Sequence, residues 1–154
     1  MPNTPAMIQA GATGLHAGEG VSEAQKNLAE SILRAVGLTR WVSDESLMDA
    51  VTALSGSGPA YFFLFMEAMI DAGCELGLDR DTATLMTQQT ALGAATMALE
   101  SDVDLVELRR RVTSPAGTTE RAVQSFEDSG LRDIVSKAMA AAEARAVEMA
   151  QEMG

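Results

Sequence analysis

The fold is decided by a long apolar run that opens with Gly58-Pro59-Ala60-Tyr61-Phe62-Phe63-Leu64-Phe65-Met66 and continues to Leu76. Apolar side chains point in nearly every direction around a helix of this sequence, so residues 60–76 are expected to form the central, buried helix. Pro59 suits the first helical position, where its missing N–H costs no hydrogen bond. The serines and glycines of residues 55–58 are expected to break the helix before it.

Helical signals continue on both sides of this run. Gly77 is expected to end the central helix, and Asp79 or Asp81 to cap the next one. The expected helices cover about 22–36, 47–54, 60–76, 81–100, 104–112, 119–129 and 131–153. The last one repeats alanine and methionine along one side, a stripe that is typical either of a subunit contact or of a plain core helix. The sequence therefore predicts a mainly α fold.

The amino-terminal part carries strand signals instead. Met1–Pro5 contains two prolines and is expected to be an extended loop rather than a helix. Residues 10–17 and 39–42 have strand-like patterns, and Ser22 with Gln25 predicts a capping box for the helix between them. Two short strands cannot build a sheet core alone, so this β-α-β segment requires a partner sheet. We divide the chain into residues 1–43 and 44–154.

Composition narrows the functional classes. With 154 residues, 47% of them hydrophobic, the chain has the size of one domain and enough apolar residues for a core. A formal charge of −11 disfavours nucleic acid and anionic lipid as partners. The absence of a long apolar segment and of a signal pattern predicts a cytoplasmic protein without membrane contact.

Few side chains offer a metal or acid–base site. The only cysteine, Cys74, excludes a disulfide within the chain and is expected to be a buried apolar residue. The only histidine, His16, is expected at a surface or interface. Glu67 and Asp71 lie one helical turn apart, a spacing that permits metal binding, although an exposed stripe is the more common explanation. No metal site is predicted.

The strongest polar signal is the stretch Arg109-Arg110-Arg111-Val112-Thr113-Ser114-Pro115-Ala116-Gly117-Thr118-Thr119-Glu120. Pro115 starts a turn, Gly117 permits a positive φ, and Thr118 or Thr119 can cap the next helix. Free backbone N–H groups at such a helix start can bind a carboxylate or phosphate. The arginines either add a positive field or only complement a helix C-terminus. An ordinary loop and cap is the alternative reading of the whole stretch.

Three segments together resemble pyrroline-5-carboxylate reductase, the last enzyme of proline synthesis. They are Met1-Pro2-Asn3-Thr4-Pro5, residues 54–61 and residues 112–119. The resemblance implies a helical dimerisation bundle preceded by a short β-α-β remnant of a Rossmann domain. The 154 residues contain no Gly-x-Gly-x-x-Gly turn for a dinucleotide, so we expect a fragment that is inactive by itself.

The resemblance also implies roles for particular residues. Thr119 takes the catalytic role, with its hydroxyl nearest the ring nitrogen of the imine. The other implied contacts to the substrate, pyrroline-5-carboxylate, or to the product, proline, come from Ser114, Gly117, Thr118, Gly58 and Pro59. Asn3 and Thr4 are implied on the nicotinamide side of NADP or NAD, and the partner is a second copy in a homodimer or a larger assembly. Thr118 departs from the family pattern, in which many relatives have alanine.

Two alternatives belong to other classes. The first is a non-catalytic helical oligomerisation module that has kept the loop. The second, the helical half of a hydroxyacid dehydrogenase, requires a catalytic lysine in a central helix. Lys26 and Lys137 are the only lysines, and both lie among polar residues on their helix faces. This second alternative is therefore disfavoured.

Overall fold

A computed structural model describes residues 1–153, with side chains up to Glu152. The chain forms two compact units, one of residues 1–62 with 135–154 and one of residues 63–134. Each unit is described by itself below. The division at residue 43 made from the sequence remains a proposal. Among the described residues, no helix combines the length and hydropathy needed to cross a bilayer.

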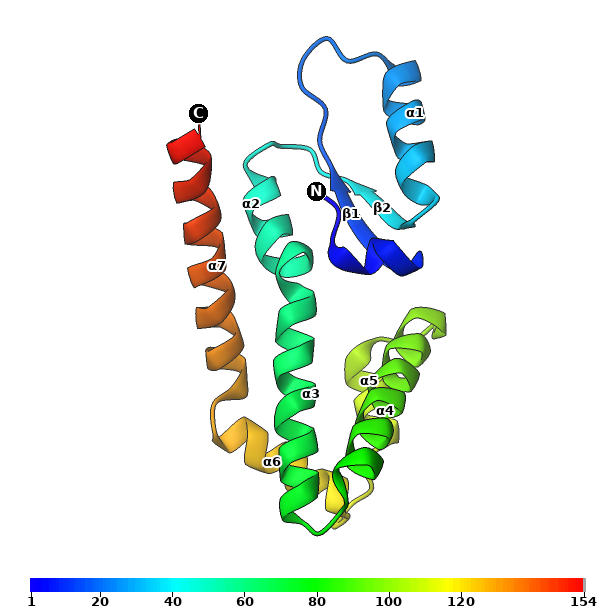
Figure 1. Cartoon of the computed structure of the whole chain (residues 1–154), viewed down its shortest axis with the longest axis vertical. Helices are drawn as coiled ribbons and strands as arrows, with labels where there is room; N and C mark the ends of the chain where they lie inside the picture. Colours follow the sequence, from blue (N-terminus) through cyan, green and yellow to red (C-terminus); the bar gives the residue numbers. More distant parts are fainter. Residues whose placement is uncertain (154) are drawn as a thin grey trace. The chain divides into compact units, whose positions relative to one another are not determined.

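The first unit contains the predicted β-α-β segment. Strands β1 (Gly11–Leu15) and β2 (Gly37–Trp41) pair in parallel, with Gly11 opposite Gly37. Helix α1 (Glu23–Arg34) connects them, and Figure 1 shows it beside the two strands. The predicted capping box is confirmed, since the Ser22 hydroxyl accepts from the Gln25 amide and the Gln25 side chain accepts from the Ser22 amide.

A glycine is required where the chain enters β2. Gly37 has φ +149°, and a Cβ there would lie 2.0 Å from the carbonyl oxygen of Gly11 on the paired strand. Only a residue without a side chain allows the two parallel strands to approach so closely at this point. The sequence predicted the preceding helix to run to about residue 36, but α1 ends at Arg34 and Gly37 begins the strand.

Two sequence predictions for the first unit are wrong. Residues Thr4–Ile8 form a short 3-10 helix, η1, and not an extended loop, because Pro5 lies in its first turn where a missing N–H is tolerated. Helix α2 (Leu47–Val51) does not break at the serines and glycines but widens into a π-helix, η2 (Thr52–Gly56). The Ser57 amide keeps the turn closed by donating to the Thr52 carbonyl at 2.8 Å.

The remaining elements are helices at nearly the predicted places. They are α3 (Gly58–Glu75), α4 (Arg80–Glu100), α5 (Leu105–Arg111), α6 (Thr118–Asp128) and α7 (Leu131–Met153). Asp79 caps α4 by accepting from the Thr82 amide at 2.9 Å. Gly77 ends the preceding turn with φ +102°, as a left-handed helix end requires. Pro59 is the second residue of α3 rather than the first.

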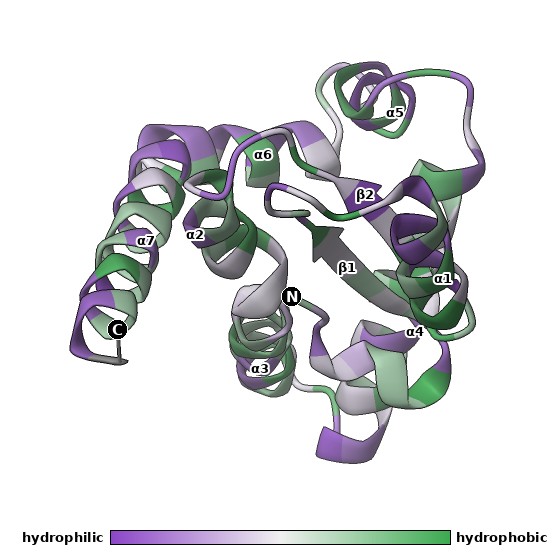
Figure 2. Cartoon of the chain, turned by 90° about the horizontal axis from the view of Figure 1, so that it is seen from above, coloured by the Kyte–Doolittle hydropathy of each residue, from purple (hydrophilic) through white to green (hydrophobic). Residues whose placement is uncertain are grey.

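The central helix is not buried in the single chain, contrary to prediction. Figure 2, in which α3 is seen nearly end-on, colours much of this helix as hydrophobic. Its largest side chains are open to solvent. The exposed fractions reach 70% for Phe62, 58% for Phe63 and 66% for Leu64. Cys74, predicted to be buried, is only half-buried. An all-round apolar sequence indicates that a helix must be covered, but it does not show which chain supplies the cover.

One buried polar group is expected to weaken the sheet unit. Thr13 of β1 is 3% exposed, and its hydroxyl has no hydrogen-bond partner among residues 1–153. A buried hydroxyl without a partner costs about 1–3 kcal/mol. Thr13→Val keeps the branched shape and removes the hydroxyl, so we expect it to raise the free energy of unfolding by about 1 kcal/mol in urea titrations. Thr52→Val, which removes a hydroxyl bonded to the Met48 carbonyl at 2.8 Å, is the control and should not stabilise.

Candidate functional site: the loop before helix α6

The loop between α5 and α6 makes a tight turn, although not with the residues predicted. Gly117 is the N-cap of α6 with φ −83°, and no side chain caps the helix. The left-handed residue is Ala116, with φ +58°. The predictions of a positive φ at Gly117 and of a threonine cap are therefore wrong. Gly117 still needs to be small, because a Cβ there would lie 3.0 Å from the Ser114 carbonyl oxygen.

Two of the amides in the turn are already used. The Gly117 amide donates to the Ser114 carbonyl at 3.0 Å, and the Ala116 amide donates to Oε2 of Glu120 at 2.8 Å. Within the described residues, the amides of Thr118, Thr119 and Glu120 have no hydrogen-bond partner. These three N–H groups are the free first turn of α6, where the helix dipole favours negative charge. The turn therefore retains donors for a carboxylate.

The hydroxyls of the turn differ in exposure. Ser114 and Thr118 are exposed, while Thr119 and Gly117 are half-buried. The Thr113 hydroxyl is used inside the fold, since it donates to the Arg109 carbonyl at 2.6 Å. The structure thus brings Ser114, Gly117, Thr118 and Thr119 into one turn. Of the hydroxyl-bearing residues Ser114, Thr118 and Thr119, only Thr119 is half-buried.

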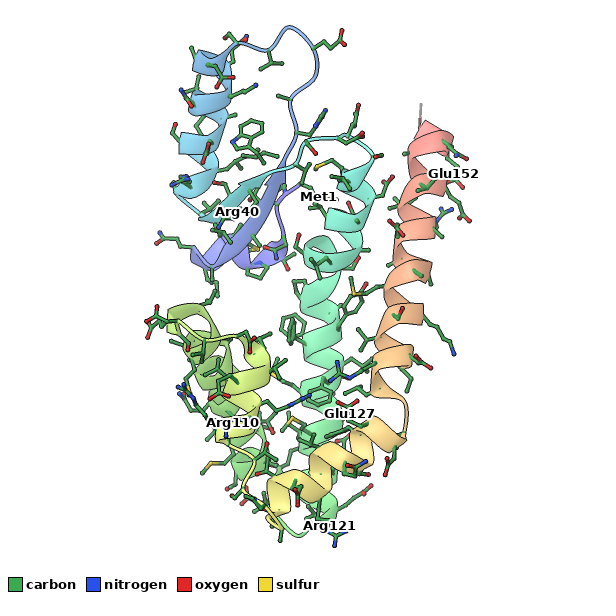
Figure 3. The ribbon with its side chains drawn as sticks, turned by 180° about the vertical axis from the view of Figure 1, so that it is seen from behind. Met1, Arg40, Arg110, Arg121, Glu127 and Glu152 are labelled. Atoms are coloured by element: carbon green, nitrogen blue, oxygen red, sulfur yellow. The ribbon has the colours of Figure 1, made fainter. Side chains whose placement is uncertain are left out.

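The three arginines before the turn are all paired, but they share two carboxylates. Arg110 and Arg111 both pair with Glu107, at 2.6 and 2.9 Å, and Arg109 pairs with Glu127 of α6 at 3.4 Å. Hydrogen bonds from Arg110 and then Arg111 lower the pKa of the Glu107 carboxyl to about 2. Figure 3 shows Arg110 on α5 and Glu127 on α6. Glu107 is shared by two arginines and Glu127 also pairs with Arg132, so these side chains keep a net positive charge while their N–H groups are engaged. The backbone amides are therefore the unpaired donors of the turn itself.

The other predicted site residues belong to the first unit. Gly58 is buried and Pro59 half-buried at the start of α3. Thr4 opens η1, and Asn3 precedes it as the N-cap residue. The Asn3 side chain accepts from the Ala12 amide at 2.9 Å and donates to the Ser55 carbonyl at 3.0 Å. Asn3 and Gly58 are thus linked through η2, whereas the turn belongs to the second unit.

The isolated acids, the histidine and the cysteine form no second site. Asp71 pairs with Arg80 at 2.6 Å, and Glu67 is exposed, as the stripe interpretation expected. No group of three or more His, Cys, Asp or Glu side chains within residues 1–153 could hold a metal ion. His16 is half-buried, with Nδ1 3.4 Å from the Val42 carbonyl oxygen.

Sequence reasoning missed the role of Glu120. Its carboxylate accepts at 2.8 Å from the amide of Ala116, the residue with the positive φ. An acid at the third position of a helix is a known signal, because its side chain can reach back to the residues before the first turn. The acid thus bonds back across the helix start, where the sequence predicted a threonine cap.

An open apolar groove lies between α3 and α4 in the second unit. Its volume is about 500 Å³, and its lining residues are Phe63, Met66, Glu67, Ile70, Gln88, Ala91 and Leu92. Leu92 is 61% exposed and Phe63 58% exposed. Large apolar side chains that share one exposed surface are typical of an interface with another protein chain.

Comparison with known proteins gives one consistent result. A family model described as pyrroline-5-carboxylate reductase dimerisation matches residues 45–149. A pyrroline-5-carboxylate reductase from Pseudomonas aeruginosa is 57% identical over 100% of this chain and 56% of its own length. One from Pasteurella multocida is 47% identical over 97% of this chain and 54% of its own length. The chain therefore spans about half the length of the curated relatives it matches.

Solved structures agree with the sequence comparison. A pyrroline-5-carboxylate reductase from Coxiella burnetii has a TM-score of 0.94 and 57% identity, with 96% of this chain and 55% of that chain covered. A Plasmodium falciparum pyrroline carboxylate reductase with NADP bound has a TM-score of 0.89 and 33% identity, with 97% and 61% covered.

The helices within residues 45–149 define the class of helical dimerisation domains, and the short parallel β segment lies before the matched range. The relatives and the family model identify that class further. The chain belongs to the pyrroline-5-carboxylate reductase dimerisation family, as its three sequence segments indicated.

Proposed function

We propose that this chain supplies the substrate-binding turn and the subunit interface of a pyrroline-5-carboxylate reductase, which reduces a cyclic imine to L-proline with NADPH or NADH. The observation that carries the proposal is the free first turn of α6, where the amides of Thr118, Thr119 and Glu120 have no partner among the described residues. These amides hold the ring carboxylate in the proposed site. A cytoplasmic location is part of the same proposal.

In this proposal, Thr119 lies next to the C=N bond that is reduced. Its hydroxyl lies on the residue whose amide is also free, so one residue can face both the carboxylate and the ring nitrogen. Ser114, Gly117 and Thr118 complete the turn, and Gly58 and Pro59 are proposed as the floor of the substrate site. For hydride addition to a C=N bond, the protein mainly has to orient the imine and to provide a group that donates the proton to its nitrogen.

The residues of this chain do not fit a whole dinucleotide. The 154 residues contain no Gly-rich turn for a pyrophosphate, and one donor and one acceptor of the Asn3 amide are already bonded to main-chain atoms. We therefore derive no step through the cofactor from these residues. Contacts of Asn3 and Thr4 with a nicotinamide remain a proposal.

The partner in this proposal is a second copy of the chain. Phe62, Phe63 and Leu64 of α3 are exposed in the single chain, and the matching family is one of dimerisation domains. Helix α7 supports the same conclusion, because none of its residues up to Glu152 is buried although alanine and methionine repeat along it. When the same surfaces of a second copy cover them, the two copies form a symmetric dimer. Larger assemblies can be built from this dimer.

Calorimetry with proline tests the proposal. We expect the 154-residue chain to bind proline weakly, with a Kd on the order of 1 mM, and to show no turnover of pyrroline-5-carboxylate with NADPH. Pyrrolidine, which has the ring but lacks the carboxylate, is the matched control and should give no binding heat. If proline gives no heat at the highest concentration reached while the chain remains a dimer, the alternative of a non-catalytic oligomerisation module is correct. Turnover at ordinary enzymatic rates would show that the cofactor site is present after all.

A further inference from the structure

Asn3 does not act as an ordinary helix cap. It occupies the N-cap position of η1, where an asparagine side chain normally accepts from an amide of the first helical turn. No such hydrogen bond is formed here. The side chain instead bonds the main chain of two distant segments, Ala12 in β1 and Ser55 in η2, which lie 9 and 52 residues away in the sequence.

The π-helix has a specific need for such a partner. In a π turn the carbonyls bond amides five residues on, so some of the carbonyls near its end lose the partners that an α-helix provides. The Thr52 carbonyl accepts from the Ser57 amide, the Ala53 carbonyl from the Tyr61 hydroxyl at 3.1 Å, and the Ser55 carbonyl from Asn3. Side chains thus satisfy two carbonyls that the widened turn leaves open.

The position of η2 determines where α3 begins. Ser57 joins the two helices, and its carbonyl accepts from the Ala60 amide at 3.0 Å. Gly58 and Pro59 lie between these two bonded positions. A displacement of the Ser55 carbonyl would therefore move the residues that follow it, because only three residues separate Ser55 from Pro59.

We propose that Asn3 is a positioning residue, whose amide side chain ties β1 to the π-helix and so holds Gly58 and Pro59 in place at the start of α3. That these two residues form the floor of the substrate site rests on the function proposed above. The hydrogen bonds of Asn3 to Ala12 and Ser55 do not depend on that function. A single amide suits this task because it offers one acceptor and one donor on the same rigid plane.

Two substitutions separate the two hydrogen bonds. Asn3→Asp keeps an acceptor for the Ala12 amide but places a carboxylate oxygen against the Ser55 carbonyl, whereas Asn3→Ala removes both bonds. The measurement is amide hydrogen exchange by NMR on the 154-residue chain. In Asn3→Asp we expect the Ser57 and Ala60 amides to exchange at least about tenfold faster and the Ala12 amide to stay protected. In Asn3→Ala all three amides should exchange faster.

Two control variants distinguish this local effect from general loss of stability. Asn27→Asp makes the same chemical change at the only other asparagine, which is exposed on α1, and should leave all three amides unchanged. Ser22→Ala weakens the same unit through the α1 cap, and should speed exchange at Gln25 and Lys26 rather than at Ser57 and Ala60.

Proline calorimetry on the same variants tests whether the two Asn3 hydrogen bonds affect the proposed substrate site. We expect Asn3→Asp to weaken proline binding about fivefold or more, while Ser22→Ala leaves the affinity within twofold. If the unsubstituted chain binds no proline, the proposed function fails, and the exchange data still decide the role of Asn3. The proposal would be overturned if the Ser57 and Ala60 amides of Asn3→Ala exchange within threefold of their rates in the unsubstituted chain. It would also be overturned if Asn3→Asp speeds exchange at the Ala12 amide as much as at the Ser57 amide.

Discussion

Replacing Phe63 with glutamate is expected to convert the proposed dimer into single chains. Phe63 is 58% exposed on α3 and lines the groove of about 500 Å³ beside α4. The single chain tolerates a charge there because the position faces water. In the proposed dimer, where a second copy covers Phe63, the same carboxylate would be buried without a partner, which costs several kcal/mol. Sedimentation equilibrium at micromolar concentration should therefore change from twice 16.2 kDa to 16.2 kDa.

The matched control for this prediction is Met7→Glu. Met7 is 90% exposed on η1 and lies outside residues 45–149, the part that the dimerisation family covers. This variant makes a similar apolar-to-acid change and should leave the mass at two chains. Circular dichroism should show equal helix content in both variants, because neither side chain is buried within its own chain. A Phe63→Glu protein that stays dimeric would place the subunit contact elsewhere.

Thr119→Ala is expected to remove most of the proline binding. In the proposed site the hydroxyl of this half-buried residue meets the ring nitrogen while the neighbouring amides hold the carboxylate. Hydrogen bonds to charged groups contribute about 1.5–3 kcal/mol, so calorimetry should show a Kd about 10- to 100-fold weaker. Thr119→Ser restores the hydroxyl and should return the affinity to within about threefold.

Substitutions at Thr118 test the backbone donors separately from the hydroxyls. Thr118→Ala removes an exposed hydroxyl and keeps the amide, so binding should change little. Thr118→Pro removes the amide N–H at the first position of α6, where proline is compatible with the helix and with the extended Gly117 before it. We expect this variant to weaken proline binding about tenfold. Equal affinities for the alanine and proline variants would contradict carboxylate binding by this amide.

Local sequence signals predicted the helices well where their partners are near in the chain. Ser22 with Gln25, and Asp79 with Thr82, form the caps that their spacing indicated. The same reasoning failed at Thr118 and Thr119, because it weighed only hydroxyl caps and the acid at position 120 reaches the Ala116 amide instead. It also failed at residues 52–56, where Asn3 and Tyr61 supply partners that allow a π turn in place of a break.

The pairing of Arg109, Arg110 and Arg111 with acidic side chains is another case of this limit. Glu107 lies three and four residues before two of them, so its pairing follows from helical spacing. Glu127 lies on another helix, and its contact with Arg109 depends on how α5 and α6 fold together. Charge composition along one segment therefore could not show that the arginines are already paired.

The sequence by itself determined that the chain is mainly helical, that a parallel β-α-β segment precedes the helices, and that its three segments belong to the pyrroline-5-carboxylate reductase family. These properties depend on periodicity, caps and residue spacing, which are local. Only the tertiary structure decided which amides of the α6 turn remain free, that α3 is exposed in the single chain, and that Asn3 bonds β1 and η2. Such bonds join residues far apart in the chain, and no local pattern specifies which of many polar groups will meet.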